Sequence, residues 1–125
     1  MADVDVAGRR VLVVEDEVLI AFLIEETLAG MGCEIVGPAA NLDAALQLAN
    51  EAAIDAAILD VSIRDGKVYP VAARLEELGI PFAFASGYGD WTMPDAMRDR
   101  PRLAKPFTIV ALEQQIRSLC QRPVV

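Results

Sequence analysis

Short apolar runs rich in β-branched residues alternate along this chain with longer amphipathic segments. The first run, Arg10–Val14 (RVLVV), is typical of a strand that is buried on both faces of a sheet. The longer segments show helical spacing of their apolar residues, with Asn41 and Thr108 available as N-caps and Gly79 as an end signal. The pattern predicts strands at 10–14, 34–39, 56–60, 81–86 and 102–105, and helices at 18–32, 42–53, 67–79, 94–100 and 108–121.

This (βα)5 alternation favours a doubly wound α/β fold, in which one parallel sheet is covered by helices on both faces. At 125 residues the chain has the size of a single domain, with its core expected at about 9–121. The fourth predicted helix is the weakest, because only a short piece between Pro94 and Pro101 has helical character. We therefore expect residues 87–101 to be loop-rich and mobile, with a short or disordered fourth helix.

The chain is acidic, with 19 Asp and Glu residues against 11 Lys and Arg residues and a net charge of −8. Nucleic-acid backbones and anionic membranes attract clustered lysine and arginine, so we expect neither as a partner. No apolar run approaches the roughly 20 residues that span a bilayer, and residues 1–10 lack the order of a signal peptide. These features favour a cytoplasmic location.

Histidine is absent, and the chain has two cysteines, Cys33 and Cys120. The absence of histidine excludes a Ser-His-Asp or Cys-His catalytic site and any histidine-ligated metal within this chain. Two scattered cysteines are too few for a disulfide framework or a zinc site. Chemistry here must use carboxylates, hydroxyls, lysine or a hard cation.

Polar residues stand at the ends of four predicted strands. Glu15 and Asp16 follow the first strand, Asp60 ends the third, Ser86 ends the fourth and Lys105 ends the fifth. A single polar residue after a strand is commonly a turn residue. In a parallel sheet, however, the carboxyl ends of the strands line the crevice where ligands bind, so we expect these side chains to converge.

The converging set is suited to phosphoryl transfer. Adjacent carboxylates repel one another, and a divalent cation relieves the repulsion; oxygen ligands with room for water favour Mg²⁺. The cation, the Lys105 ammonium and the Ser86 hydroxyl could then stabilise charge on a phosphoryl group. Asp60 is the candidate nucleophile because apolar residues isolate it, whereas Asp16 belongs to an acidic cluster suited to the metal.

Four motifs in this order and spacing, VLVVEDE, AAILDVSIRDG, FAFASGYG and LAKPF, resemble the receiver domain of two-component response regulators. The segment PFAFASGYG resembles the subgroup named for a PFxFATGY motif. The resemblance covers nearly the whole chain and implies a flavodoxin-like fold with strand order 2-1-3-4-5. It implies one stand-alone receiver domain over residues 1–125, with no output domain.

The resemblance also implies a role for each site residue. These roles are phosphoacceptor for Asp60, direct metal ligand for Asp16, metal partner through water for Glu15, backbone-carbonyl ligand for Ser62, switch hydroxyl for Ser86, and ion-pair partner with a cis bond to Pro106 for Lys105. The chain departs from the common pattern at Arg102, where a switch Tyr or Phe often stands, and in a shorter loop after Asp60. We therefore take Tyr88 as the candidate substitute for the switch aromatic.

A receiver of this kind would take a phosphoryl group from the phosphohistidine of a sensor histidine kinase or phosphotransfer protein. We expect a signalling protein rather than an enzyme, one that assists its own phosphorylation and dephosphorylation with Mg²⁺ as cofactor. It would signal through contacts with a downstream protein, or drain phosphate from a kinase, as a monomer or weak dimer.

Other classes of function stay open at this point. An Mg²⁺-dependent phosphohydrolase of the haloacid dehalogenase type would need an aspartate where Ser62 stands. A flavin protein would need a phosphate-binding loop after the first strand, where the acidic EDEV segment would repel phosphate. A receiver-like interaction module that does not use phosphate is the third alternative.

Overall fold

A computed structural model describes residues 5–64, 66–87 and 93–121 of the chain. The five strands of its main sheet are β1 (Arg10–Val14), β2 (Glu34–Ala39), β3 (Ala56–Asp60), β6 (Phe82–Ser86) and β7 (Arg102–Ala104). All neighbouring pairs are parallel, in the order β2-β1-β3-β6-β7. When only these strands are counted, this order is the predicted 2-1-3-4-5 of a flavodoxin-like receiver fold, which is confirmed.

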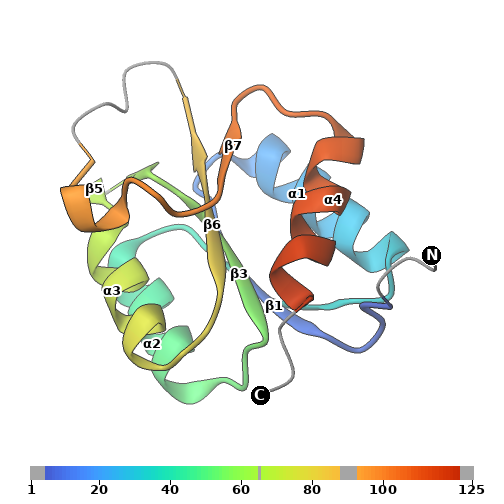
Figure 1. Ribbon diagram of the computed structural model, residues 1–125, viewed down its shortest axis with the longest axis horizontal. Helices are drawn as coiled ribbons and strands as arrows, with labels where there is room; N and C mark the ends of the chain where they lie inside the picture. The colour runs from blue at the N-terminus through green and yellow to red at the C-terminus, as the bar shows by residue number, and fades with distance from the viewer. Residues whose placement is uncertain (1–4, 65, 88–92, 122–125) are drawn as a thin grey trace.

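Four α-helices cover the two faces of the sheet in the described part of the chain: α1 (Val18–Gly30), α2 (Leu42–Glu51), α3 (Tyr69–Glu77) and α4 (Ile109–Cys120). Figure 1 shows α2 and α3 on one side and α1 and α4 on the other. Both predicted N-caps are present, because the Asn41 side chain accepts a hydrogen bond from the Ala44 amide at 2.8 Å and Thr108 Oγ1 accepts one from the Ala111 amide at 3.0 Å. Among the described residues, no helix combines the length and apolarity that a membrane crossing requires.

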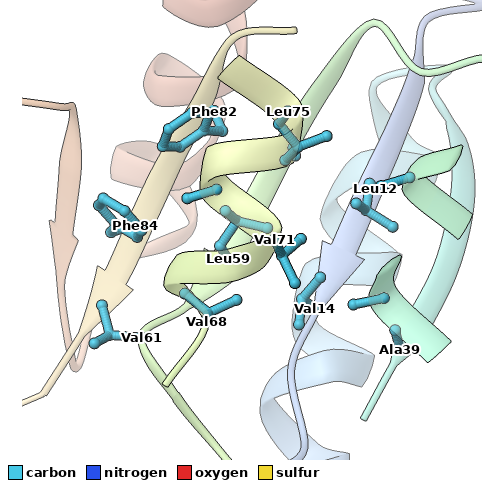
Figure 2. Packing of buried hydrophobic residues seen from close by; sticks show 14 of the residues in the cluster. Leu12, Val14, Ala39, Leu59, Val61, Val68, Val71, Leu75, Phe82 and Phe84 are labelled. Atoms are coloured by element: carbon cyan, nitrogen blue, oxygen red, sulfur yellow. The ribbon is translucent and has the colours of Figure 1, made fainter. Parts of the chain in front are cut away.

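Alternate residues of each central strand enter the two cores. Leu12 and Val14 pack toward α2 and α3, whereas Val11 and Val13 pack toward α1 and α4. Figure 2 shows the first of these cores, where Phe84 on β6 lies on the same face as the side chains of α3. Fully burying a side chain of this size stabilises the fold by roughly 1.5–3 kcal/mol. Because both faces of the sheet are apolar, its strands could be recognised in the sequence as short hydrophobic runs.

Between β6 and β7 the structure describes residues 87 and 93–101. The helical piece among them is a short 3-10 helix, η1 (Asp95–Met97), in place of a full fourth helix. Met93 and Met97 are buried in the core beside α3. The prediction of a short helix here is confirmed, while Tyr88 lies outside the described residues and its proposed switch role stays a prediction.

Two features were absent from the sequence prediction. A small antiparallel hairpin, β4 (Ser62–Ile63) and β5 (Gly66–Lys67), lies between β3 and α3, where part of a helix was expected. The peptide bond between Gly37 and Pro38 is cis. The hairpin also moves the start of α3 to Tyr69, two residues after the predicted start at Lys67.

Candidate functional site

Three carboxylates meet at the carboxyl ends of β1 and β3. Asp60 is the last residue of β3, and Glu15 and Asp16 follow β1 directly. The two strands are paired in parallel register, with Val14 opposite Leu59, so their ends lie side by side. Carboxylate oxygens of Glu15, Asp16 and Asp60 lie within 4.8 Å of one another. Asp16 is half-buried, while Glu15 and Asp60 are only 2% and 5% exposed.

Lys105, directly after β7, supplies a positive charge to this cluster. Its Nζ lies 3.1 Å from Glu15 Oε1 and 3.2 Å from Asp60 Oδ2. The Lys105 amide donates a hydrogen bond to the Ser86 carbonyl at 2.8 Å, and the bond from Lys105 to Pro106 is cis. The end of β7 is thereby attached to the end of β6, which holds the lysine at the same edge as the carboxylates.

Burial and charge shift the proton affinities of the buried groups. Burial, with the neighbouring Glu15 carboxylate, raises the pKa of Asp60 from its ordinary 3.8 to about 7, although Lys105 opposes the rise. Burial lowers the pKa of Lys105, but the carboxylates of Asp60 and Glu15 outweigh it, so the pKa of this ammonium is raised. Lys105 therefore stays charged, while Asp60 holds a proton more tightly than an exposed aspartate does.

The donor set fits a hard divalent cation. Three carboxylates face one ammonium, so the cluster carries an excess of negative charge when all are ionised. Within the described residues, Glu15 Oε1 is buried and accepts no hydrogen bond of regular geometry, so its polar contact is the ion pair with Lys105. Oxygen-only ligands of this kind suit Mg²⁺.

The two serines occupy the same edge. Ser62 donates its amide to Asp60 Oδ1 in a long hydrogen bond of 3.4 Å, and its hydroxyl accepts a hydrogen bond from Lys67 Nζ at 2.6 Å. Ser86 is buried at the end of β6, opposite Ala104 of β7. The structure therefore places Glu15, Asp16, Asp60, Ser62, Ser86 and Lys105 at one edge of the sheet.

Arg102 stands at the position where a switch Tyr or Phe was expected, and its side chain contacts Met93. Its Nη2 lies 3.1 Å from the Sδ of Met93. The side chain thus extends from β7 toward Met93, two residues before η1.

Sequence reasoning missed a hollow beside the acidic cluster. Its volume is about 250 Å³, and it lies between α1, the end of β2 and the β4–β5 hairpin. The hollow is lined by Glu15, Asp16, Val18, Ala21, Phe22, Glu25, Pro38, Ala40 and Arg64. The Asp65–Gly66 pair in the sequence is a hairpin signal that could have indicated the turn carrying Arg64.

Comparison with known proteins agrees with this fold. The chain is 41% identical to SdrG from Sphingomonas melonis Fr1, whose solution structure superimposes with a TM-score of 0.79 over 90% of this chain and 96% of that one. A solution structure of the BeF3-activated conformation of SdrG, from Pseudomonas melonis Fr1, is 38% identical, with a TM-score of 0.75 over 96% of this chain and 99% of that one.

The transcriptional regulatory protein PdtaR of Mycobacterium tuberculosis is 35% identical over 114 residues, which are 86% of this chain and 55% of that protein. The chain thus spans about half the length of the curated relatives it matches. Residues 11–117 match the response regulator receiver domain family. The chain therefore belongs to the receiver domains of two-component response regulators.

Proposed function

We propose that Asp60 accepts a phosphoryl group from the phosphohistidine of a sensor histidine kinase or phosphotransfer protein. Receiver domains are generally signalling modules that such proteins phosphorylate. The observation that carries the proposal is the placement of Asp60, buried at the end of β3 and 3.2 Å from Lys105 Nζ. Its carboxylate lies within 4.8 Å of those of Glu15 and Asp16.

In the transfer, an ionised Asp60 oxygen attacks phosphorus while the P–N bond of the donor imidazole breaks, and the bonding pair returns to the ring nitrogen. The Lys105 ammonium, already beside the carboxylate, stabilises the charge that gathers on the phosphoryl oxygens. The Ser86 hydroxyl, at the end of the adjacent strand, donates a hydrogen bond to one of these oxygens. Attack of water on the same phosphorus returns Asp60 to its free form.

We assign the metal site to the carboxylates of Asp16 and Asp60 and the backbone carbonyl of Ser62, with Glu15 in an outer position. Receiver domains bind Mg²⁺ at an acidic pocket, and the acidic cluster of this chain has the matching donors. When bound, Mg²⁺ would neutralise the repulsion between carboxylates and phosphoryl oxygens. A protonated Asp60 is a poor nucleophile, so a cation that favours the ionised form also prepares the acceptor.

The phosphorylated state would act through the surface made by residues 93–101, β7 and α4. The phosphoryl group would bind the Ser86 hydroxyl and the Lys105 ammonium, and both residues adjoin this surface. A downstream protein could recognise the changed surface, or the domain could serve as a phosphate sink for a kinase.

Intact-mass spectrometry tests the acceptor. Incubation with phosphoramidate and Mg²⁺ should add one phosphoryl group to the wild type, and chelation of Mg²⁺ should abolish the addition. Asp60→Asn should give no adduct, whereas Asp43→Asn, an exposed carboxylate on α2, should react as the wild type does. An adduct that persists in Asp60→Asn would overturn the assignment of the acceptor.

A further inference from the structure

Arg64 is the basic residue that lines the hollow beside the acidic cluster. The same hollow, of about 250 Å³, is lined by the carboxylates of Glu15, Asp16 and Glu25. Lys105 does not line this hollow; its Nζ contacts Glu15 and Asp60. Lys105 follows the end of β7, whereas Arg64 lies in the hairpin after β3.

The hairpin holds Arg64 in a defined position. Ile63, directly before it, is buried in the core beside α2 and α3, and Val68 after the hairpin donates its amide to the Val61 carbonyl at 2.9 Å. Ile63 pairs with Gly66, whose φ of 143° is open to glycine. Arg64 itself is exposed and directly follows β4.

In the part of the chain that the structure describes, no other residue engages the guanidinium of Arg64. Within the described residues it forms no ion pair and no side-chain hydrogen bond, whereas Arg74 and Arg100 each contact a glutamate. The three carboxylates that line the hollow would repel an approaching phosphoryl group. Among the described residues Arg64 forms no ion pair with these carboxylates, so its guanidinium is suited to receive an incoming anion.

We propose that Arg64 is a phosphoryl-binding residue, whose guanidinium donates hydrogen bonds to the phosphoryl oxygens of the incoming donor and then of the aspartyl phosphate. This inference rests on the proposed function of Asp60 as phosphoacceptor. Arginine fits the role because its planar fork binds two phosphoryl oxygens at once and stays charged at any physiological pH. Arg64 would act on the outer side of the phosphoryl group, and Lys105 on the side of the buried carboxylates.

The proposal predicts opposite effects on two ligands. Without Arg64 the hollow is more negative, so Mg²⁺ alone should bind about two- to three-fold more tightly. A phosphoryl group or its analogue beryllofluoride should bind more weakly, because a charge-assisted contact is lost. A purely structural role for Arg64 would move both affinities in the same direction or leave both unchanged.

The test compares Arg64→Ala and Arg64→Lys with Arg74→Ala, which removes the same charge from α3. Calorimetry measures the affinity for Mg²⁺ and, at saturating Mg²⁺, for beryllofluoride; intact-mass spectrometry measures the rate of phosphorylation by phosphoramidate. Arg64→Ala should lower the beryllofluoride affinity and the phosphorylation rate by about 10-fold. Arg64→Lys should retain part of the beryllofluoride affinity and part of the phosphorylation rate, and Arg74→Ala should match the wild type in both.

The outcomes separate this inference from the proposed function. Unchanged beryllofluoride affinity and phosphorylation rate in Arg64→Ala, with a reactive wild type, would overturn the role of Arg64 alone. Equal losses in Arg74→Ala would overturn it too, because they would reflect net charge rather than position. A wild type that neither gains a phosphoryl group nor binds beryllofluoride would overturn the assignment of Asp60 itself. Thermal unfolding of each variant checks that the fold is retained, with Arg64→Gln as a second replacement.

Discussion

Lys105 Nζ lies 3.1 Å from Glu15 Oε1 and 3.2 Å from Asp60 Oδ2, so one ammonium joins two buried carboxylates. The lysine side chain is itself only 15% exposed. Neither carboxylate could stay ionised at low energy cost without this cation, and removal of one member of a buried set leaves the others uncompensated. The stability of the free domain and the reactivity of Asp60 are therefore linked through the same three groups.

The stability of the metal-free domain should fall as pH rises from about 4 to 7. The folded state keeps the Asp60 proton up to a pKa of about 7, whereas the unfolded chain releases it near its ordinary 3.8. The folded state thus binds more protons in this window, and its stability decreases with increasing pH. Asp60→Asn should abolish this decrease and be more stable than the wild type at pH 8 by about 1–3 kcal/mol.

Urea unfolding in chelator at pH 4.5 and pH 8 measures this difference. The matched control is Asp43→Asn, an exposed aspartate on α2 whose replacement should leave the pH dependence of the wild type intact. If Asp60→Asn and the wild type lost stability in parallel between these pH values, burial of Asp60 would not be the cause.

Lys105→Met should destabilise the domain by about 3 kcal/mol at pH 8, because Glu15 and Asp60 then lie buried together without a cation. The loss should be smaller at pH 5.5, where Asp60 takes up a proton, and smaller again in the Asp60→Asn background. Urea unfolding of the single and double variants gives the coupling between the two residues. Lys67→Met on the exposed hairpin serves as the control, and an equal loss there would contradict the prediction.

Thr108→Ala should lower stability by about 1 kcal/mol while the phosphoramidate adduct of Asp60 forms as in the wild type. The Thr108 hydroxyl caps α4 by accepting a hydrogen bond from the Ala111 amide at 3.0 Å, and it takes no part in the acidic cluster. Thr108→Ser keeps the hydroxyl and should retain nearly full stability. Thermal unfolding and intact mass together check the result, and a loss of adduct in Thr108→Ala would show that the cap also supports the site.

Beryllofluoride with Mg²⁺ should slow amide exchange of residues 87–101, if the phosphoryl group orders the region between β6 and β7. The physical reason is that Ser86, which would bind the analogue, directly precedes this region, and Lys105, which would also bind it, follows the next strand, β7. Amide exchange measured by mass spectrometry with and without the analogue tests this prediction. Helix α2 provides the internal control, because it follows β2, the edge strand opposite β7. Equal exchange of residues 87–101 in both states would contradict an order–disorder switch.

Much of the fold could be predicted because its signals are local. The run at residues 10–14 coincides with β1 and that at 56–60 with β3, since each is short and mostly apolar, with a carboxylate residue directly after it (Glu15) or at its end (Asp60). Asn41 caps α2 as expected, because capping uses an amide only three residues away. The hairpin of Ser62 to Lys67 was missed because it is too short for hydrophobic periodicity to indicate it.

The sequence by itself determined the five strands of the main sheet and the approximate positions of the helices, and it placed the carboxylates, Ser86 and Lys105 at strand ends. Local spacing of apolar residues is sufficient for this, and parallel pairing then brings strand ends to one edge. Only the tertiary structure decided that Lys105 contacts both Glu15 and Asp60, that burial raises the pKa of Asp60, and that Arg64 lines the hollow. These properties depend on distances and water exclusion between segments far apart in the chain, which no local pattern of residues specifies.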